Sequence, residues 1–141
     1  MVLDELGVLL QTAGLGTLRQ TIFLGSMPMD APGNVTPDAI MALLETPGPA
    51  PLLVHDDVLP SIEQPIIQVR TRDAPYNYEG ARLRAEQAWR TLSSIHNQDV
   101  SGTAYLGILP LQSPFPLDTD DFARPHIIFH IRCSKALSAL P

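Results

Sequence analysis

Residues 65–95 read PIIQVRTRDAPYNYEGARLRAEQAWRTLSSI, and this stretch contains the signals that decide the predicted fold. In its first part, Ile67, Val69 and Thr71 alternate with polar side chains, and a period of two places the apolar set on one face of a β-strand. Pro75 ends this run, because proline lacks a backbone N–H and disfavours helical backbone in the residue before it. A different element must therefore follow.

The second part of the stretch has the spacing of a helix. Apolar side chains recur at steps of three and four, which predicts an amphipathic helix over about residues 76–96. Trp89 contributes the largest single apolar area of its stripe. Residues 96–99 are polar, and we expect them to leave the helix as a loop. The apolar stripe consists of Tyr78, Ala81, Ala85, Ala88, Trp89, Leu92 and Ile95.

The remaining segments predict a sheet on which the helix can lie. Residues 2–13 have helical spacing, and residues 39–45 fit either a helix or a strand, although the prolines on both sides slightly favour a strand. The other expected strands cover residues 21–25, 101–111 and 126–133. The predicted fold class is α+β, with a mixed, mostly antiparallel sheet of roughly four to five strands carrying the long helix and the N-terminal helix. We expect one domain over residues 1–141.

The predicted core lies between the long helix and the sheet. The alternation of the last strand places Phe129 and Ile131 on one face. Trp89 is expected to pack on these residues, so that Trp89→Ala would cost about 3–5 kcal/mol of stability. The predicted core residues are Ile67, Val69, Tyr78, Trp89, Leu92, Phe129 and Ile131.

Composition argues against several classes of function. A net charge of −6 and a pI near 5.0 disfavour binding to duplex nucleic acid through a basic face. A single cysteine, Cys133, leaves no partner for an internal disulfide. No apolar run approaches the roughly 20 residues that cross a bilayer, and the acidic, periodic N-terminus is unlike a signal peptide. We expect a protein that folds in a cytoplasm-like compartment.

Proline is unusually abundant, at 14 of 141 residues. This is about twice average usage, which predicts long irregular connections between short elements. The two most prominent are residues 46–60 and 113–125, and we expect both to be extended loops.

The histidines and acids do not predict a metal site. His126 and His130 lie on one strand, about 13 Å apart at ~3.3 Å per residue, which is too far for one zinc ion. The loop triplet His55, Asp56 and Asp57 is a better local ligand group, yet no second cluster accompanies it. The acids near residue 120 resemble the start of a calcium loop but lack the later glycine and glutamate. We predict no catalytic, metal-binding or cofactor-binding residues, and no cofactor.

Two groups of charged residues are candidates for an interface. The arginines around the strand and helix form the one basic concentration, which fits either a solvated surface or a contact with an acidic partner. The loop over residues 113–125 combines three acids with two aromatic residues. The candidate interface residues are Arg70, Arg72, Arg82, Arg84, Phe115, Asp118, Asp120 and Asp121.

Several segments together resemble a known protein family. They are LLQTAGLGTL, TIFLGSMP, AIMALLETPGPAP and IIQVRTRDAPYNYEGARLRAEQAWRTL, followed by the closing strand PHIIFHIRCSKA. In this order they are similar to the tail-terminator, or "minor capsid", proteins of the head–tail joining region (the neck) of long-tailed bacteriophages and prophages. The resemblance extends over almost the whole chain.

The resemblance implies an α/β fold without catalysis and a hexameric ring that ends the tail tube. Its implied partners are other copies of the chain, the tail-tube protein and the head-connector or stopper protein, with DNA passing through the lumen and no membrane. The implied location is the virion, after assembly in the host cytoplasm. Two alternatives stay open: an adaptor or head-completion protein of a phage-like particle, and a small metal- or ligand-binding protein that uses His55, Asp56 and Asp57.

Overall fold

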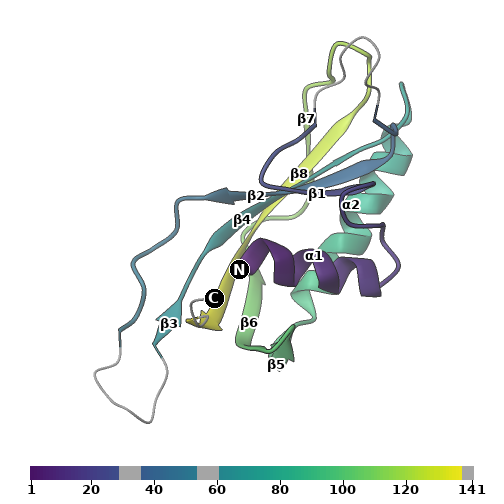
Figure 1. Cartoon of the computed structure of the whole chain (residues 1–141). Helices are drawn as coiled ribbons and strands as arrows, with labels where there is room; N and C mark the ends of the chain where they lie inside the picture. Colours follow the sequence, from purple (N-terminus) through teal and green to yellow (C-terminus); the bar gives the residue numbers. More distant parts are fainter. Residues whose placement is uncertain (29–35, 54–60, 138–141) are drawn as a thin grey trace.

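The computed structural model describes residues 1–28, 36–53 and 61–137, and these contain two helices and one eight-stranded sheet (Figure 1). None of the described helices is long and apolar enough to cross a membrane. The helices are α1 (Val2–Thr12) and α2 (Tyr78–Ser93), and the strands are β1 (Ile22–Leu24), β2 (Ile40–Thr46), β3 (Ile62–Glu63), β4 (Ile66–Arg72), β5 (His96–Val100), β6 (Thr103–Pro110), β7 (Phe115–Leu117) and β8 (His126–Ala136).

The long strand β8 organises the sheet. The strand order is β1-β2-β4-β8-β6-β5, and β3 and β7 also pair with β8. β1 runs parallel to β2, while the other strand pairs are antiparallel. The α+β class and the mixed, mostly antiparallel sheet are therefore confirmed. The expected strand number of roughly four to five is wrong.

The additional strands are polar or short. Residues 96–99, expected as a loop, lie in β5, which pairs with β6 as a hairpin. Ser101 and Gly102 form its turn with φ values of 50° and 85°, as a tight hairpin turn requires. The segment expected as a loop over residues 113–125 contains β7. Backbone pairing holds these strands, so they show no apolar alternation in the sequence.

Helix α2 begins and ends close to the prediction. The side chain of Asn77 accepts a hydrogen bond of 3.1 Å from the N–H of Gly80 and so caps the helix. The helix ends at Ser93, one turn earlier than expected. In α1, the chain leaves the helix through Gly14, whose φ of 82° suits a residue without a side chain.

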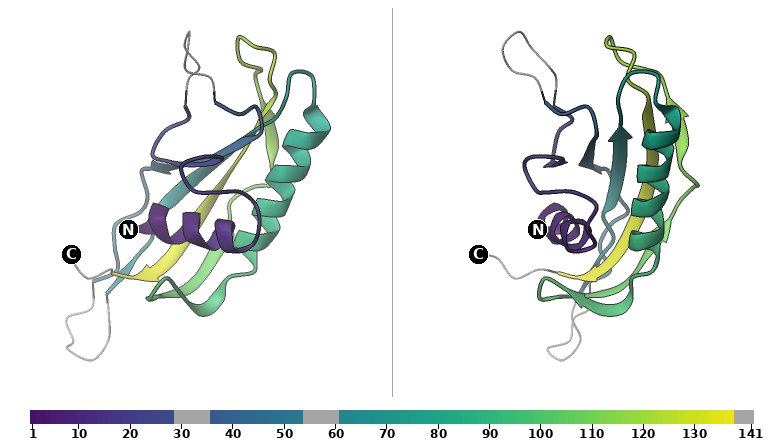
Figure 2. Two further views of the ribbon diagram at one scale, coloured as in Figure 1. Left: turned by 45° about the vertical axis from the view of Figure 1, so that its right-hand side comes forward. Right: turned by 90° about the vertical axis from the view of Figure 1, so that its right-hand side faces the viewer.

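Both helices contribute to one core on the same face of the sheet. The hydroxyl of Thr71 donates to the carbonyl of Ala81 at 3.0 Å and so fixes α2 over β4. Figure 2 shows that α1 and α2 run in clearly different directions. The fully buried residues include Ile67, Val69, Leu92, Phe129 and Ile131.

Two aromatic residues of the predicted core are not fully buried. Tyr78 is 45 % exposed and lies outside the core, which corrects the prediction. Strand β4 ends at Arg72, so the sheet surface under α2 begins near Ala81, one turn beyond Tyr78. Trp89 is half-buried at the edge of the core, where its indole N–H donates to the carbonyl of Gln112 at 3.1 Å.

Candidate functional site

The four candidate arginines do not form one surface. Arg72 is only 1 % exposed and donates to the carbonyls of Pro37 and Asp38 at 2.7 and 3.1 Å, and to the hydroxyl of Thr36 at 3.0 Å. It ties β4 to the segment before β2. Arg72 is therefore structural, and its prediction as an interface residue is wrong.

The other three arginines are half-buried or at the surface. Arg82 pairs with Glu86 at 3.1 Å, and Arg84 lies 3.8 Å from Asp73. Arg70 lies on the opposite face of the sheet from Thr71 and donates to Gln68 at 3.2 Å. The Arg82–Glu86 pair is the more solvated of the two ion pairs and contributes at most about 1 kcal/mol, so Arg82 is available for other contacts at little cost.

The candidate acids lie in the turn that connects β7 to β8. We call residues 117–124, which begin with the last residue of β7, the acidic turn. Asp120 organises it: one oxygen accepts from the backbone N–H groups of Phe122 and Arg124 at 2.9 and 3.0 Å, and the other from the Arg124 side chain at 2.8 Å. Burial alone would raise the pKa of Asp120, but the hydrogen bonds from Arg124, His126 and Phe122 outweigh it and lower the pKa. Asp120 therefore shapes the turn.

The rest of the acidic turn faces solvent. Asp118 and Asp121 are exposed, and so are Leu117 at 41 % and Phe122 at 55 %. Phe115 lies in β7 opposite Ile128 and is half-buried. The turn thus presents two carboxylates and two apolar side chains together.

The segment that leads into α2 braces the acidic turn. The N–H of Tyr76 donates to the carbonyl of Ala123 at 3.1 Å, and the N–H of Ala123 donates to the carbonyl of Asp120 at 3.0 Å. Tyr76 and Ala123 have φ values of 63° and 59°, which non-glycine residues rarely adopt. The Arg124 guanidinium lies 4.8 Å from the centre of the Phe122 ring. Strain of this kind persists where surrounding contacts enforce it and is common at functional sites.

A second cluster of charged groups is buried at the other end of β8. The ammonium group of Lys135, which is 0 % exposed, lies 2.9 Å from Glu5 and 3.3 Å from Glu63. The hydroxyl groups of Tyr105 and Thr103 donate to Glu5 at 2.6 and 2.8 Å. This cluster joins α1, β3, β6 and β8, and we call it the Glu5–Lys135 network.

This network was not predicted from the sequence, although the sequence contains a signal for it. Lys135 follows Ile131 and Cys133 on the apolar face of the last strand, and Glu5 lies beside Leu6 in an apolar run of the first helix. A charged residue at a position that the periodicity assigns to the core predicts a buried partner of opposite charge. The sequence does not say which partner.

We expect the network to make the fold sensitive to acid. Burial alone would raise the pKa of Glu5, but hydrogen bonds from Tyr105, Lys135 and Thr103 outweigh it and hold the pKa below its ordinary value of 4.5. Because the pKa is lowered in the folded state, the ionised Glu5 contributes its full stabilisation at any pH above the ordinary value. That contribution is lost as the pH falls through the folded-state pKa. Glu5→Gln should therefore cost on the order of 3 kcal/mol at neutral pH and much less in acid. Urea unfolding of both proteins over a pH series measures the difference, and a difference that does not change with pH would contradict the assignment.

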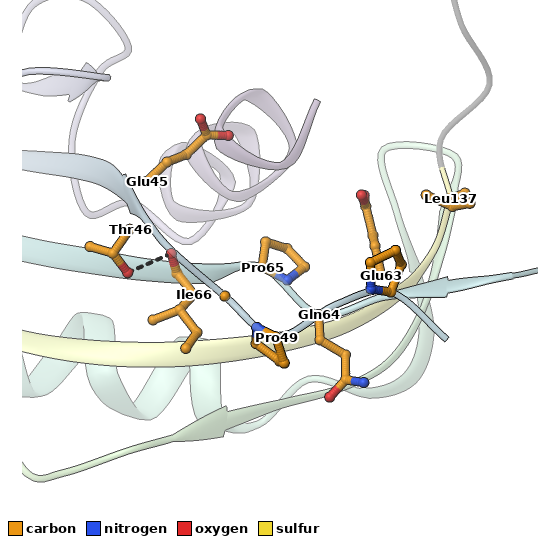
Figure 3. A pocket seen from close by; sticks show the side chains of 10 residues that line it. Glu45, Thr46, Pro49, Glu63, Gln64, Pro65, Ile66 and Leu137 are labelled. Atoms are coloured by element: carbon orange, nitrogen blue, oxygen red, sulfur yellow. Dashed lines mark hydrogen bonds between the residues drawn. The ribbon is translucent and has the colours of Figure 1, made fainter. Parts of the chain in front are cut away.

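A shallow hollow of about 270 Å³ lies beside the start of the loop over residues 46–60 (Figure 3). The Thr46 hydroxyl donates to the carbonyl of Ile66 at 3.0 Å there. A side chain at Gly48 would lie 2.6 Å from the carbonyl of Gln64, so glycine allows the two segments to approach closely. The lining includes Glu45, Glu63 and three prolines, which do not form a catalytic arrangement. His55, Asp56 and Asp57 lie outside the described residues.

The described residues contain no group of three histidines, cysteines or acids placed to hold a metal ion. Burial raises the pKa of the Cys133 thiol to about 12, so this thiol is unreactive at neutral pH. Burial lowers the pKa of His126, against the opposing effect of Asp120.

Comparisons with known proteins identify a relationship. A family model described as bacteriophage tail terminator protein matches residues 9–135. A solved structure described as "Virion of native gene transfer agent (GTA) particle" contains a chain with a TM-score of 0.54 and 13 % identity, covering 93 % of this chain and 84 % of that one. At this identity the likeness shows a shared fold. Among curated proteins, none matches the chain.

Proposed function

Because the chain belongs to the bacteriophage tail terminator family, which confirms the resemblance seen in the sequence, we propose that it forms a hexameric ring that ends the tail tube. The chain is thus a structural protein of the phage virion. The match over residues 9–135 carries this conclusion. The ring would join the tail tube to the head-connector or stopper protein, in the neck, after assembly in the host cytoplasm.

The surface chemistry supports a ring around DNA. A closed ring with head-to-tail contacts needs two different, complementary surfaces on each subunit, because the same contact repeats around the axis. The net charge of −6 would repel the phosphate backbone, so that DNA passes through the lumen without binding to it. The exposed acids and the half-buried arginines provide surfaces of different charge.

The chain would act as one domain over residues 1–141, with its proline-rich segments contacting neighbouring subunits. In Figure 1, residues 47–53 and β3 extend away from the rest of the sheet. Leu52 and Leu53 are 58 and 61 % exposed, and Leu52 bridges to Ile62. Prolines reduce the entropy lost when such a segment binds, which favours a contact role.

Tail tubes assembled without this protein test the proposal. When purified protein is added, we expect tubes to stop growing and to acquire heads, because the ring blocks further addition of tube subunits and provides the head-binding surface. Electron microscopy measures tube length and head attachment. A heat-unfolded sample of the same protein is the control. Tubes that keep growing without heads, with and without the folded protein alike, would contradict the proposal.

A further inference from the structure

The acidic turn exposes the aromatic side chain of Phe122 on a backbone that several hydrogen bonds restrain. The bonds of Asp120, the link from Tyr76 to Ala123 and the Arg124 guanidinium all restrain the backbone beside Phe122. A connection between two strands does not need such bracing to leave a phenylalanine 55 % exposed. Rigid, exposed aromatic residues are typical anchors of protein interfaces, because they are ordered before they bind.

A complementary hollow lies where α2 ends against the β5–β6 hairpin. It is a wide hollow of about 510 Å³ that is open to solvent over much of its extent. Leu106 and Leu109 in its lining are 50 and 52 % exposed. The lining also contains His96 and Arg132, and none of its residues carries a carboxylate. The hollow is therefore apolar with basic groups, whereas the exposed charges of the acidic turn are the carboxylates of Asp118 and Asp121.

The two surfaces are well separated along β8. The acidic turn directly precedes His126, and the hollow lies beside Arg132, which pairs with Leu109. At ~3.3 Å per residue, β8 separates them by about 20 Å, so a turn cannot reach the hollow of its own chain. Figures 1 and 2 show the β7–β8 turn at the top and the β5–β6 hairpin at the bottom of the molecule.

We propose that the acidic turn of one subunit inserts into the Leu106–Leu109 hollow of a second copy of this chain. Phe122 packs on the two leucines, and Asp118 and Asp121 approach Arg132 and His96. The contact is head-to-tail, so it can repeat around a ring. This inference rests on the proposed function, to which it adds the surfaces that join one subunit to the next.

Cysteine cross-linking tests this contact directly. A chain with Phe122→Cys and Leu109→Cys should form a ladder of covalent oligomers under mild oxidation, because each subunit then carries one cysteine on each surface. Each single variant should remain uncross-linked, and a mixture of the two single variants should stop at dimers. The native Cys133 is buried and does not interfere.

The matched control combines Leu83→Cys with Leu109→Cys, since Leu83 is also exposed, at 57 %, but lies on the outer side of α2. Cross-linking is measured with free protein at high concentration and with protein bound to tail tubes. No ladder under either condition, or an equal ladder from the control, would overturn the proposed contact. If wild-type protein ends tubes but the Phe122–Leu109 ladder is absent, the proposed contact is wrong and the proposed function stands. If the ladder forms but wild-type protein does not end tubes, the proposed function is wrong and the contact stands.

Charge exchange provides a second test, which needs no oxidation. Asp121→Arg and Arg132→Asp should each weaken self-association, measured by sedimentation, and the double variant should restore it because the attraction is re-formed with its signs exchanged. Phe122→Ala should weaken self-association roughly thirtyfold, as expected for an interface anchor. If the double variant self-associates no more strongly than the weaker of the two single variants, the proposed pairing of Asp121 with Arg132 is contradicted.

Discussion

Replacing Lys135 with alanine is expected to lower the free energy of unfolding by about 3–5 kcal/mol, because the substitution removes the buried cation that lies nearest to the Glu5 carboxylate. The two charged groups are 2.9 Å apart, and the Lys135 side chain is 0 % exposed. The N-terminal ammonium also lies 3.6 Å from Glu5, but it is largely exposed and replaces the lost partner only in part. Urea unfolding at neutral pH measures the effect.

Two control variants separate the charge effect from simple truncation. Arg82→Ala removes the cation of a surface pair, with a side chain 33 % exposed, and should cost less than about 1 kcal/mol. The double variant Glu5→Gln with Lys135→Met removes both charges and keeps an acceptor for Tyr105, so most of the stability should return. A loss for Lys135→Ala as small as that for Arg82→Ala would show that the network contributes little.

Phe129→Ala is expected to cost about 3–5 kcal/mol, because it opens a cavity at the centre of the core. Phe129 is 0 % exposed and lies opposite Val69 in the middle of the sheet. Trp89→Ala should cost less, about 2 kcal/mol, since Trp89 is half-buried and its main polar contact is one hydrogen bond to Gln112.

The comparison of these two variants tests where the core lies. The sequence suggested the full cost of about 3–5 kcal/mol for Trp89, because size and helical spacing placed it at the centre of the stripe. Thermal or urea unfolding of both variants gives the order of their costs. A larger loss for Trp89→Ala than for Phe129→Ala would mean that α2 is rotated relative to the structure described.

The strongest sequence patterns predicted their elements well. The alternation that includes Ile67 and Val69 became β4, and the stripe that includes Ala85 and Leu92 became the buried side of α2. These patterns are reliable because burial of one face imposes a fixed period on the sequence. Strand β2 was also favoured correctly over a helix at residues 39–45, from the prolines beside it.

Elements without a buried face of their own could not be predicted in this way. Strand β5 is almost entirely polar and exposed, while β3 and β7 have only two and three residues. Backbone hydrogen bonds to neighbouring strands hold them, and these bonds do not depend on which side chains are present. The strand count was therefore too low.

The sequence by itself determined the α+β class, the two helices, the main strands and the family, because these depend on periodicity and on ordered local segments. Only the tertiary structure decided which charged residues serve the fold and which serve a surface. Arg72 and Asp120 were expected to meet a partner but bind their own chain, and Glu5 meets Lys135 across 130 positions of sequence. Such pairings depend on which strands become neighbours, and local sequence contains no distance information between segments that are far apart along the chain.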